Sequence, residues 1–143
     1  MRSAIARDCG SFMQETLEAA LAGNPAAAGF DVHYQPIVRF DDLAALAVEA
    51  LPRWNHPLAG RVQSSEFLAA AEWAGLLGVL DDFVLDRACA DARALGAVYG
   101  HPVPVHVNIS GRRLGRRDLE SSIAWVLNRG NYANTIRVRQ LDP

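Results

Sequence analysis

The sequence predicts a mixed α/β fold with a largely parallel sheet, and three observations predict it. Segments rich in aromatic and β-branched residues alternate with segments in which apolar residues recur at helical spacing. Glycine, proline and asparagine separate these segments, as they do at turns and helix ends. The chain has 143 residues, half of them hydrophobic, which is enough for one compact domain. Strands that alternate with helices are typical of parallel sheets.

The chain is expected to divide after residue 29. Residues 1–29 are predicted to form a helical lead-in and linker, with a helix over residues 15–21. Gly23 and Pro25 end that helix, because both residues stop helices. Residues 30–143 are predicted to form the α/β domain.

The first two strands of that domain are expected close together. Phe30–Val38 is rich in aromatic and β-branched residues and is predicted as a strand, and Leu43–Trp54 as a second one. Asp41 and Asp42 mark the turn between them. Two strands joined so tightly are most simply antiparallel. Asn55–Gly60 is predicted as a loop.

Two helices should follow. Ser64 or Ser65 is expected to cap the first, with Glu66 in its first turn, and this helix should end near Trp73. The second is predicted over Leu80–Leu95, because its apolar residues form one stripe: Leu80, Phe83, Val84, Ala88, Ala92 and Leu95.

The remaining elements continue the alternation. Val105–Ser110 is predicted as a strand, Arg117–Leu127 as an amphipathic helix and Thr135–Leu141 as a final strand. The expected sheet therefore has four strands and nothing that closes it.

Charged and amide side chains stand on these strands. Strand alternation puts Glu49 and Arg53 on one face of the second strand, and Asn108 on one face of the third. Burying a carboxylate or a guanidinium is costly without partners, so these groups either pair with each other or line a wet cleft. Carboxylate and amide oxygens suit Mg²⁺ or Mn²⁺, and the arginine fork suits a phosphate. Spacing alone favours a structural ion pair over a metal site, because a glutamate in a strand pairs with a nearby arginine more often than it binds a metal.

Short motifs in a fixed order narrow the choice. They are Tyr34-Gln35-Pro36-Ile37-Val38; Glu49-Ala50-Leu51 followed by Arg53-Trp54 and His56-Pro57; Glu66-Phe67 with Ala71-Glu72 and Gly75-Leu76; Leu85 with Ala88-Cys89; and Val107-Asn108-Ile109-Ser110. In this order and spacing the segment over residues 30–114 resembles the EAL domain family, the bacterial barrel module that hydrolyses cyclic di-GMP. Pro52 departs from the aliphatic residue that is usual in the family.

The resemblance implies an incomplete TIM-like (β/α) barrel, comprising about its first four strands. It makes Glu49 and Asn108 ligands of a catalytic Mg²⁺ or Mn²⁺. It also implies that Arg53 contacts a phosphate of the cyclic dinucleotide and that Gln35 lies in the substrate groove. The family's reaction opens the ring with a metal-activated water and gives linear pGpG.

The chain also departs from the family, and no complete catalytic set is expected. Arg139 aligns with a metal-binding glutamate of the fourth strand, although a shift of one or two residues would bring Asp142 closer. The paired aspartates, the lysine and the later acidic and amide residues of the family do not occur in these 143 residues. Half a barrel would also leave an open edge strand and an apolar interior face with Ile37 and Leu51, which favours self-association or a partner protein.

Three hypotheses follow. The chain is a non-catalytic EAL protein that senses cyclic di-GMP or binds a partner, or an active phosphodiesterase whose remaining barrel is supplied from elsewhere, or an interaction module without nucleotide. Whether it is a fragment, a decayed remnant or an obligate oligomer stays open.

Composition excludes other classes. The net charge of −2 and pI near 6 give no indication of DNA binding, although the basic run over residues 111–117 is either a solvated helix start or a phosphate-facing loop. No apolar window approaches a membrane span, and no secretory leader is evident, so a cytoplasmic protein is expected. Cys9 and Cys89 lack metal-like spacing, and Cys89 is expected to be a buried apolar residue rather than a reactive thiol.

Overall fold

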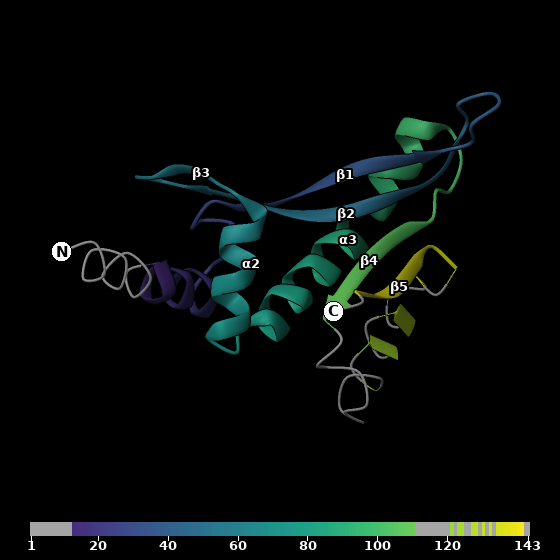
Figure 1. Cartoon of the computed structure of the whole chain (residues 1–143). Coiled ribbons are helices and arrows are strands. Elements are labelled where there is room, and N and C mark those ends of the chain that lie inside the picture. The colour runs from purple at the N-terminus through teal and green to yellow at the C-terminus, as the bar shows by residue number, and fades with distance from the viewer. Residues whose placement is uncertain are drawn as a thin grey trace. The chain divides into compact units, whose positions relative to one another are not determined.

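The computed structural model describes residues 13–110, 121, 123, 124, 127, 128, 130, 132 and 134–141 (Figure 1). They fall into two compact units. The first unit contains residues 13–31 and 52–80, and the second contains residues 32–51 and those of residues 81–141 that the structure describes. The division predicted after residue 29 stays a prediction.

The sheet follows the order β1-β2-β4-β5, and β3 pairs with β2 outside this path. The strands are β1 (Phe30–Val38), β2 (Ala45–His56), β3 (Gly60–Val62), β4 (Val105–Ser110) and β5 (Ile136–Leu141). The helices between them are α2 (Ser64–Trp73) and α3 (Leu77–Tyr99). β2 pairs with β4, and β4 with β5, in parallel. The predicted α/β class is therefore confirmed.

A hairpin joins β1 to β2. At its turn the Arg39 N–H donates to the Ala44 carbonyl at 2.9 Å, and at its far end the Asn55 N–H donates to the Gly29 carbonyl at 2.9 Å. The end of β1 is thus bonded to the start of β2, and the start of β1 to the end of β2. The two strands therefore run antiparallel, as predicted.

β2 begins two residues later than predicted. Leu43 has a φ of 57°, in the left-handed region that a strand does not use. The Asp42 carboxylate accepts a hydrogen bond from the Ala44 N–H at 3.0 Å, which fixes the turn. The strand can start only after these residues, at Ala45.

The residues predicted as a loop after β2 form a second, short hairpin instead. β2 continues to His56, which pairs with Gly60 at the start of β3. His56 Nδ1 accepts hydrogen bonds from the N–H groups of Leu58 and Ala59 at 3.2 and 3.0 Å. The imidazole thus accepts the backbone N–H groups of a tight turn, and β3 can then pair with the end of β2.

Aromatic packing forms the core of the first unit. The Phe30 and Trp54 rings stack with centroids 4.8 Å apart, and Phe67 meets both of them edge-on. Trp54 Nε1 donates to the Ala28 carbonyl at 3.0 Å, so its polar atom is satisfied although the side chain is buried. The helix at residues 13–22, which includes the predicted 15–21, buries Leu17, Ala20 and Leu21 in this unit.

The cap of α2 differs from the prediction. Gln63, rather than Ser64 or Ser65, is the N-cap residue, with extended dihedrals of φ −67° and ψ 140°. The Glu66 carboxylate accepts a hydrogen bond from the Gln63 N–H at 3.3 Å. Because Glu66 satisfies this backbone donor from the first turn, the helix begins at Ser64.

α3 packs on one face of the sheet in the second unit. It extends beyond the predicted Leu80–Leu95 at both ends, and the predicted apolar stripe is confirmed: Val84, Ala88 and Ala92 are buried, and Phe83 and Leu95 pack against the same core. The strands contribute Val32, Val48, Ala50, Val105, Val107 and Ile136 to this core. Cys89 belongs to it as well, as predicted.

The last predicted strand is confirmed as β5, and the helix predicted before it is only partly described. β5 begins at Ile136, one residue later than predicted. Of the predicted helix over residues 117–127, the described residues 121, 123, 124 and 127 are helical. The basic run over residues 111–117 lies outside the described residues. No helix in the described part of the chain is long and apolar enough to cross a membrane.

Candidate functional site

The second unit has one apolar and one polar sheet face. The apolar face packs on α3 through residues of β2, β4 and β5 at alternate positions, such as Val48, Val105 and Ile136. Because side chains alternate along a strand, the residues between them point to the opposite side. We call this side the polar sheet face; its polar residues include Gln35, Glu49, His106, Asn108, Arg137 and Arg139.

Glu49 and Asn108, the two predicted metal ligands, lie together on this face. Asn108 Nδ2 donates to Glu49 Oε1 at 2.6 Å, and both side chains are half-buried. Parallel pairing of β2 with β4 puts Glu49 beside His106, one alternate position before Asn108. Their approach is a structural fact, and their role as metal ligands stays a prediction.

Gln35 lies on the same side of the sheet. Its neighbours Val32 and Tyr34 face α3: Val32 is in the core, and Tyr34 Oη donates to Asp91 Oδ2 at 2.8 Å. Alternation therefore turns Gln35 to the polar sheet face, where it is exposed. An exposed amide on this face is available to a ligand.

Arg53 belongs to the first unit. Its side chain is half-buried, and Nη1 donates to the Pro52 carbonyl at 2.9 Å. One of its five donors is thereby used locally, and among the described residues nothing else engages the guanidinium, so its other donors can meet a phosphate. The predicted contact with a nucleotide is a prediction still.

Arg139 stands next to the Glu49–Asn108 pair. The β4–β5 register pairs Asn108 with Arg139 and His106 with Arg137. Paired residues on adjacent strands point to the same face, so two exposed guanidinium groups flank β4 on its polar side. Within the described residues neither of them forms an ion pair.

The charges around His106 reflect this arrangement. Burial lowers the pKa of His106 below its usual value, Arg139 lowers it further, Glu49 opposes the change and Arg137 adds to it. Its Nδ1 is buried and has no hydrogen-bond partner among the described residues. The polar sheet face therefore has a cationic side along β5 and a single carboxylate on β2.

Sequence reasoning missed Asp81, which fixes the end of β4. The Ser110 N–H and Oγ both donate to Asp81 Oδ2, at 3.1 and 2.9 Å, and both residues are buried. A signal existed in the sequence: Asp81 lies four residues before Leu85, on the apolar stripe of the helix, where an acid needs a partner. This contact ties α3 to the strand that carries Asn108.

The residues of this face do not fit a bound Mg²⁺ or Mn²⁺. Magnesium requires about six oxygen ligands, mostly carboxylates and waters. At the point where they meet, Glu49 and Asn108 supply one carboxylate and one amide, and nowhere in the described part of the chain do three His, Cys, Asp or Glu side chains gather as a metal site. The Asn108 amide turns its N–H towards Glu49, whereas a shared cation would require its oxygen to face the cation.

The expected apolar interior of the half barrel is not what the structure shows. Ile37 and Leu51 are half-buried on this side, but charged and amide groups dominate the polar sheet face. The reason is the alternation of β2, β4 and β5, which sends their valine and isoleucine side chains to α3.

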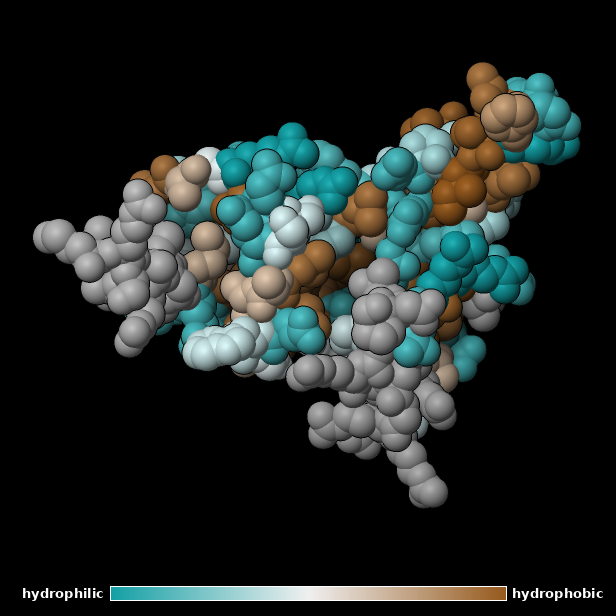
Figure 2. All heavy atoms as spheres, viewed as in Figure 1, coloured by the Kyte–Doolittle hydropathy of each residue, from teal (hydrophilic) through white to brown (hydrophobic). Residues whose placement is uncertain are grey.

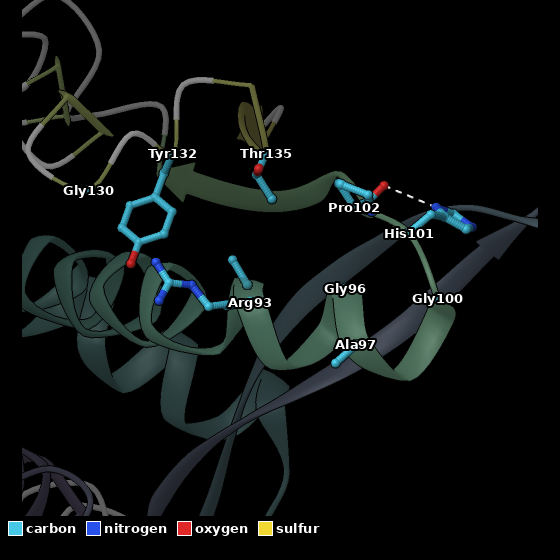
Figure 3. A pocket seen from close by; sticks show the side chains of 10 residues that line it. Arg93, Gly96, Ala97, Gly100, His101, Pro102, Gly130, Tyr132 and Thr135 are labelled. Carbon is cyan, nitrogen blue, oxygen red and sulfur yellow. Dashed lines mark hydrogen bonds between the residues drawn. The ribbon is translucent and has the colours of Figure 1, made fainter.

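A pocket of about 550 Å³ lies elsewhere in the second unit (Figure 3). The C-terminal part of α3 lines it together with the segments that precede β4 and β5, through residues that include Arg93, His101, Tyr132 and Thr135. Figure 3 shows Arg93 beside the Tyr132 ring, and His101 Nδ1 lies 3.1 Å from the Pro102 carbonyl. None of the predicted site residues lines this pocket.

The chain belongs to the EAL domain family. The family model for the EAL domain matches residues 14–139, and the motifs above lie within that span. The resemblance inferred from the sequence is therefore confirmed, and with it the fold as part of an EAL barrel.

Known relatives are much longer. Over 121 residues the chain is 36% identical to the cyclic di-GMP phosphodiesterase NbdA of Pseudomonas aeruginosa, a match over 85% of this chain and 15% of NbdA. The solved PaMucR phosphodiesterase in complex with c-di-GMP is 28% identical, with a TM-score of 0.73, over 85% of this chain and 50% of that one. The EAL enzyme Bd1971 in its cAMP-bound form has a similar fold, with a TM-score of 0.74 at 23% identity, over 98% of this chain and 40% of that one.

Proposed function

We propose that this chain binds cyclic di-GMP as a non-catalytic EAL protein. The observation that carries the proposal is the β4–β5 register, which puts the guanidinium of Arg139 beside the Glu49–Asn108 pair. Membership of the EAL family indicates cyclic di-GMP as the nucleotide, and the residues on the polar sheet face argue against its hydrolysis.

Binding is supported by the relatives and by the side chains that the chain retains. NbdA and PaMucR are named for action on cyclic di-GMP, and PaMucR was solved in complex with it. This chain keeps Gln35, exposed on the polar sheet face, and Arg53, whose guanidinium makes one hydrogen bond, to the Pro52 carbonyl, within the described residues. We propose that Gln35 contacts the nucleotide and that Arg53 binds one of its phosphates.

Lack of hydrolysis follows from the charges. Attack on a phosphodiester in this family uses divalent cations to stabilise the entering and leaving oxygens. A guanidinium beside Glu49 and Asn108 repels such cations, and the one carboxylate present already accepts a hydrogen bond from Asn108. We therefore expect no pGpG from this chain with Mg²⁺ or Mn²⁺.

Titration calorimetry with cyclic di-GMP tests the binding, and GMP is the control ligand. A charge-assisted bidentate contact contributes about 1.5–3 kcal/mol, so Arg53→Ala should weaken binding about tenfold or more. Arg61→Ala is the matched control, because Arg61 is an exposed arginine on β3, and it should leave the Kd unchanged. Equal affinities for wild type and Arg53→Ala, or no binding by either, would remove this proposal.

The second candidate function is metal-dependent hydrolysis, with the rest of the barrel supplied from elsewhere. The name of NbdA and the retained Glu49–Asn108 pair favour it. Chromatography of cyclic di-GMP incubated with the chain distinguishes the two. Appearance of pGpG that requires Mn²⁺ and is lost in Glu49→Ala would establish hydrolysis and exclude the non-catalytic proposal.

We also propose that isolated chains self-associate. β5 is the last strand of the sheet order, and among the described residues it pairs with β4 alone. A second copy can supply strand pairing to such an edge, although Arg137 and Arg139 reduce this tendency, as charges on edge strands do.

A further inference from the structure

We propose that Arg139 takes the place of a divalent cation, so that its guanidinium binds a phosphate of the nucleotide directly and no metal ion enters. This inference rests on the proposed binding of cyclic di-GMP. To that proposal it adds that Arg139 binds the phosphate, and that this contact makes a metal ion unnecessary for binding.

The position of Arg139 is fixed by backbone pairing along the whole of β4. Six successive residue pairs join β4 to β5, from Val105 with Ile136 to Ser110 with Leu141. Ile136 is buried in the core at the beginning of this ladder, and a shift of one residue would turn it out into solvent. Arg139 therefore stays on the polar sheet face, next to Asn108.

The local charge balance favours an anion at this point. Glu49 is the carboxylate that accepts the hydrogen bond of Asn108, and Arg137 and Arg139 bring two positive charges to the same face. A divalent cation would meet a net repulsion there. A phosphodiester anion would meet an attraction, and the exposed Arg139 side chain can reach it without being desolvated first.

The chemistry of the guanidinium suits the same role. Its planar fork forms two parallel hydrogen bonds to phosphate oxygens, which a cation with a tightly held water shell does not offer. The Asn108 amide has one N–H engaged with Glu49 and keeps the other for a second ligand oxygen. Arg139 and Asn108 are neighbours in the register, so both can donate to one phosphate.

Titration of the nucleotide-free chain with Mn²⁺, monitored by electron paramagnetic resonance, tests whether the cation is excluded. The wild-type 143-residue chain should show no Mn²⁺ uptake that depends on Glu49. Arg139→Glu should bind Mn²⁺ at least tenfold more tightly, and adding Glu49→Gln should abolish the gain. Arg137→Glu is the matched control, since it makes the same charge change on the same strand and face beside His106, and it should gain less. Circular dichroism checks that each variant is folded.

Calorimetry with cyclic di-GMP in EDTA and in Mg²⁺ tests the direct phosphate contact. Wild type should bind equally in both, and Arg139→Gln should raise the Kd at least tenfold, more than Arg137→Gln does. Binding that requires Mg²⁺, or Mn²⁺ uptake at Glu49 by wild type, would overturn this inference and leave the proposed nucleotide binding intact. An Arg139→Glu variant that folds and binds Mn²⁺ no better than wild type would also overturn it. Absence of nucleotide binding in every condition would overturn both proposals.

Discussion

The contact between Ser110 and Asp81 determines how firmly the end of β4 is held. One carboxylate oxygen, Asp81 Oδ2, accepts both the backbone N–H and the hydroxyl of Ser110, and both residues are 8% exposed. A buried carboxylate is costly unless its hydrogen bonds are made. Asn108 lies two residues before Ser110, so this contact also supports the polar sheet face.

Ser110→Ala should therefore destabilise the chain. The hydrogen bond from its hydroxyl to a charged group is worth about 1.5–3 kcal/mol, and its removal leaves the Asp81 carboxylate less satisfied. Urea unfolding gives the loss in free energy of unfolding. Ser65→Ala, at an exposed position of α2, should change it by less than about 0.5 kcal/mol. Similar values for the two variants would show that the contact is not stabilising.

Cys89 should be unreactive in the folded chain. Burial, and secondly the negative charge of Asp86, raise the pKa of its thiol to about 11. The thiolate is the reactive form, so reactivity should appear only as the pH rises towards that value. Mass spectrometry after iodoacetamide treatment at pH 8 should find Cys89 unmodified in buffer and modified in urea, with Cys9→Ser used to isolate the signal. Equal labelling in both solvents would contradict this.

At the scale of the elements, Gly29 is the point where the turn before β1 packs directly against the backbone of β2. Gly29 has a φ of 89°, and a Cβ there would lie 2.0 Å from the Asn55 carbonyl oxygen. Its own carbonyl accepts the Asn55 N–H, so the two backbones are in direct contact. A side chain at this position is therefore excluded by space as well as by backbone conformation.

Gly29→Ala should destabilise the chain more than the same change at Gly75. Both glycines are left-handed, which costs alanine about 1–2 kcal/mol. A Cβ at Gly75 meets nothing within 4 Å, whereas at Gly29 it must displace β2, which adds about 1–3 kcal/mol. Thermal or urea unfolding of the two variants gives the difference. An equal loss in both would show that the approach of Gly29 to Asn55 has no energetic weight.

Most elements could be predicted from the sequence because their periodicity is strong. Val105–Ser110 matches its predicted bounds, and the motif order anticipated that Glu49 and Asn108 belong to one face. What failed depends on side chains that satisfy a nearby backbone: the imidazole of His56 closes the turn before β3, and Glu66 makes Gln63 the cap. Such local competition leaves no periodic signal.

At the scale of the whole chain, exposed apolar side chains gather at one place in the second unit. Figure 2 shows hydrophobic residues around the turn between β1 and β2. The exposed fractions are 98% for Phe40, 71% for Leu43, 49% for Leu46 and 45% for Val38. An apolar cluster of this kind next to an extended hairpin favours association.

Sedimentation equilibrium at micromolar concentration should therefore show self-association. Phe40→Ser combined with Leu43→Asn should weaken it, because both remove apolar area and Asn tolerates the positive φ at position 43. Leu58→Ser removes another highly exposed leucine, in the first unit, and should have little effect. A monodisperse wild-type monomer would contradict the proposed association.

The hairpin of β1 and β2 also sets an order of events during folding. Its turn joins Arg39 to Ala44, so it closes a short loop, which takes microseconds. The pairing of Val48 with Val105 must close a far longer segment that includes both α2 and α3, and such non-local contacts form slowly. We therefore expect Glu49 to be held in a strand before β4 pairs with β2 and brings Asn108 close to it. We expect the polar sheet face to be completed late, when β4 docks.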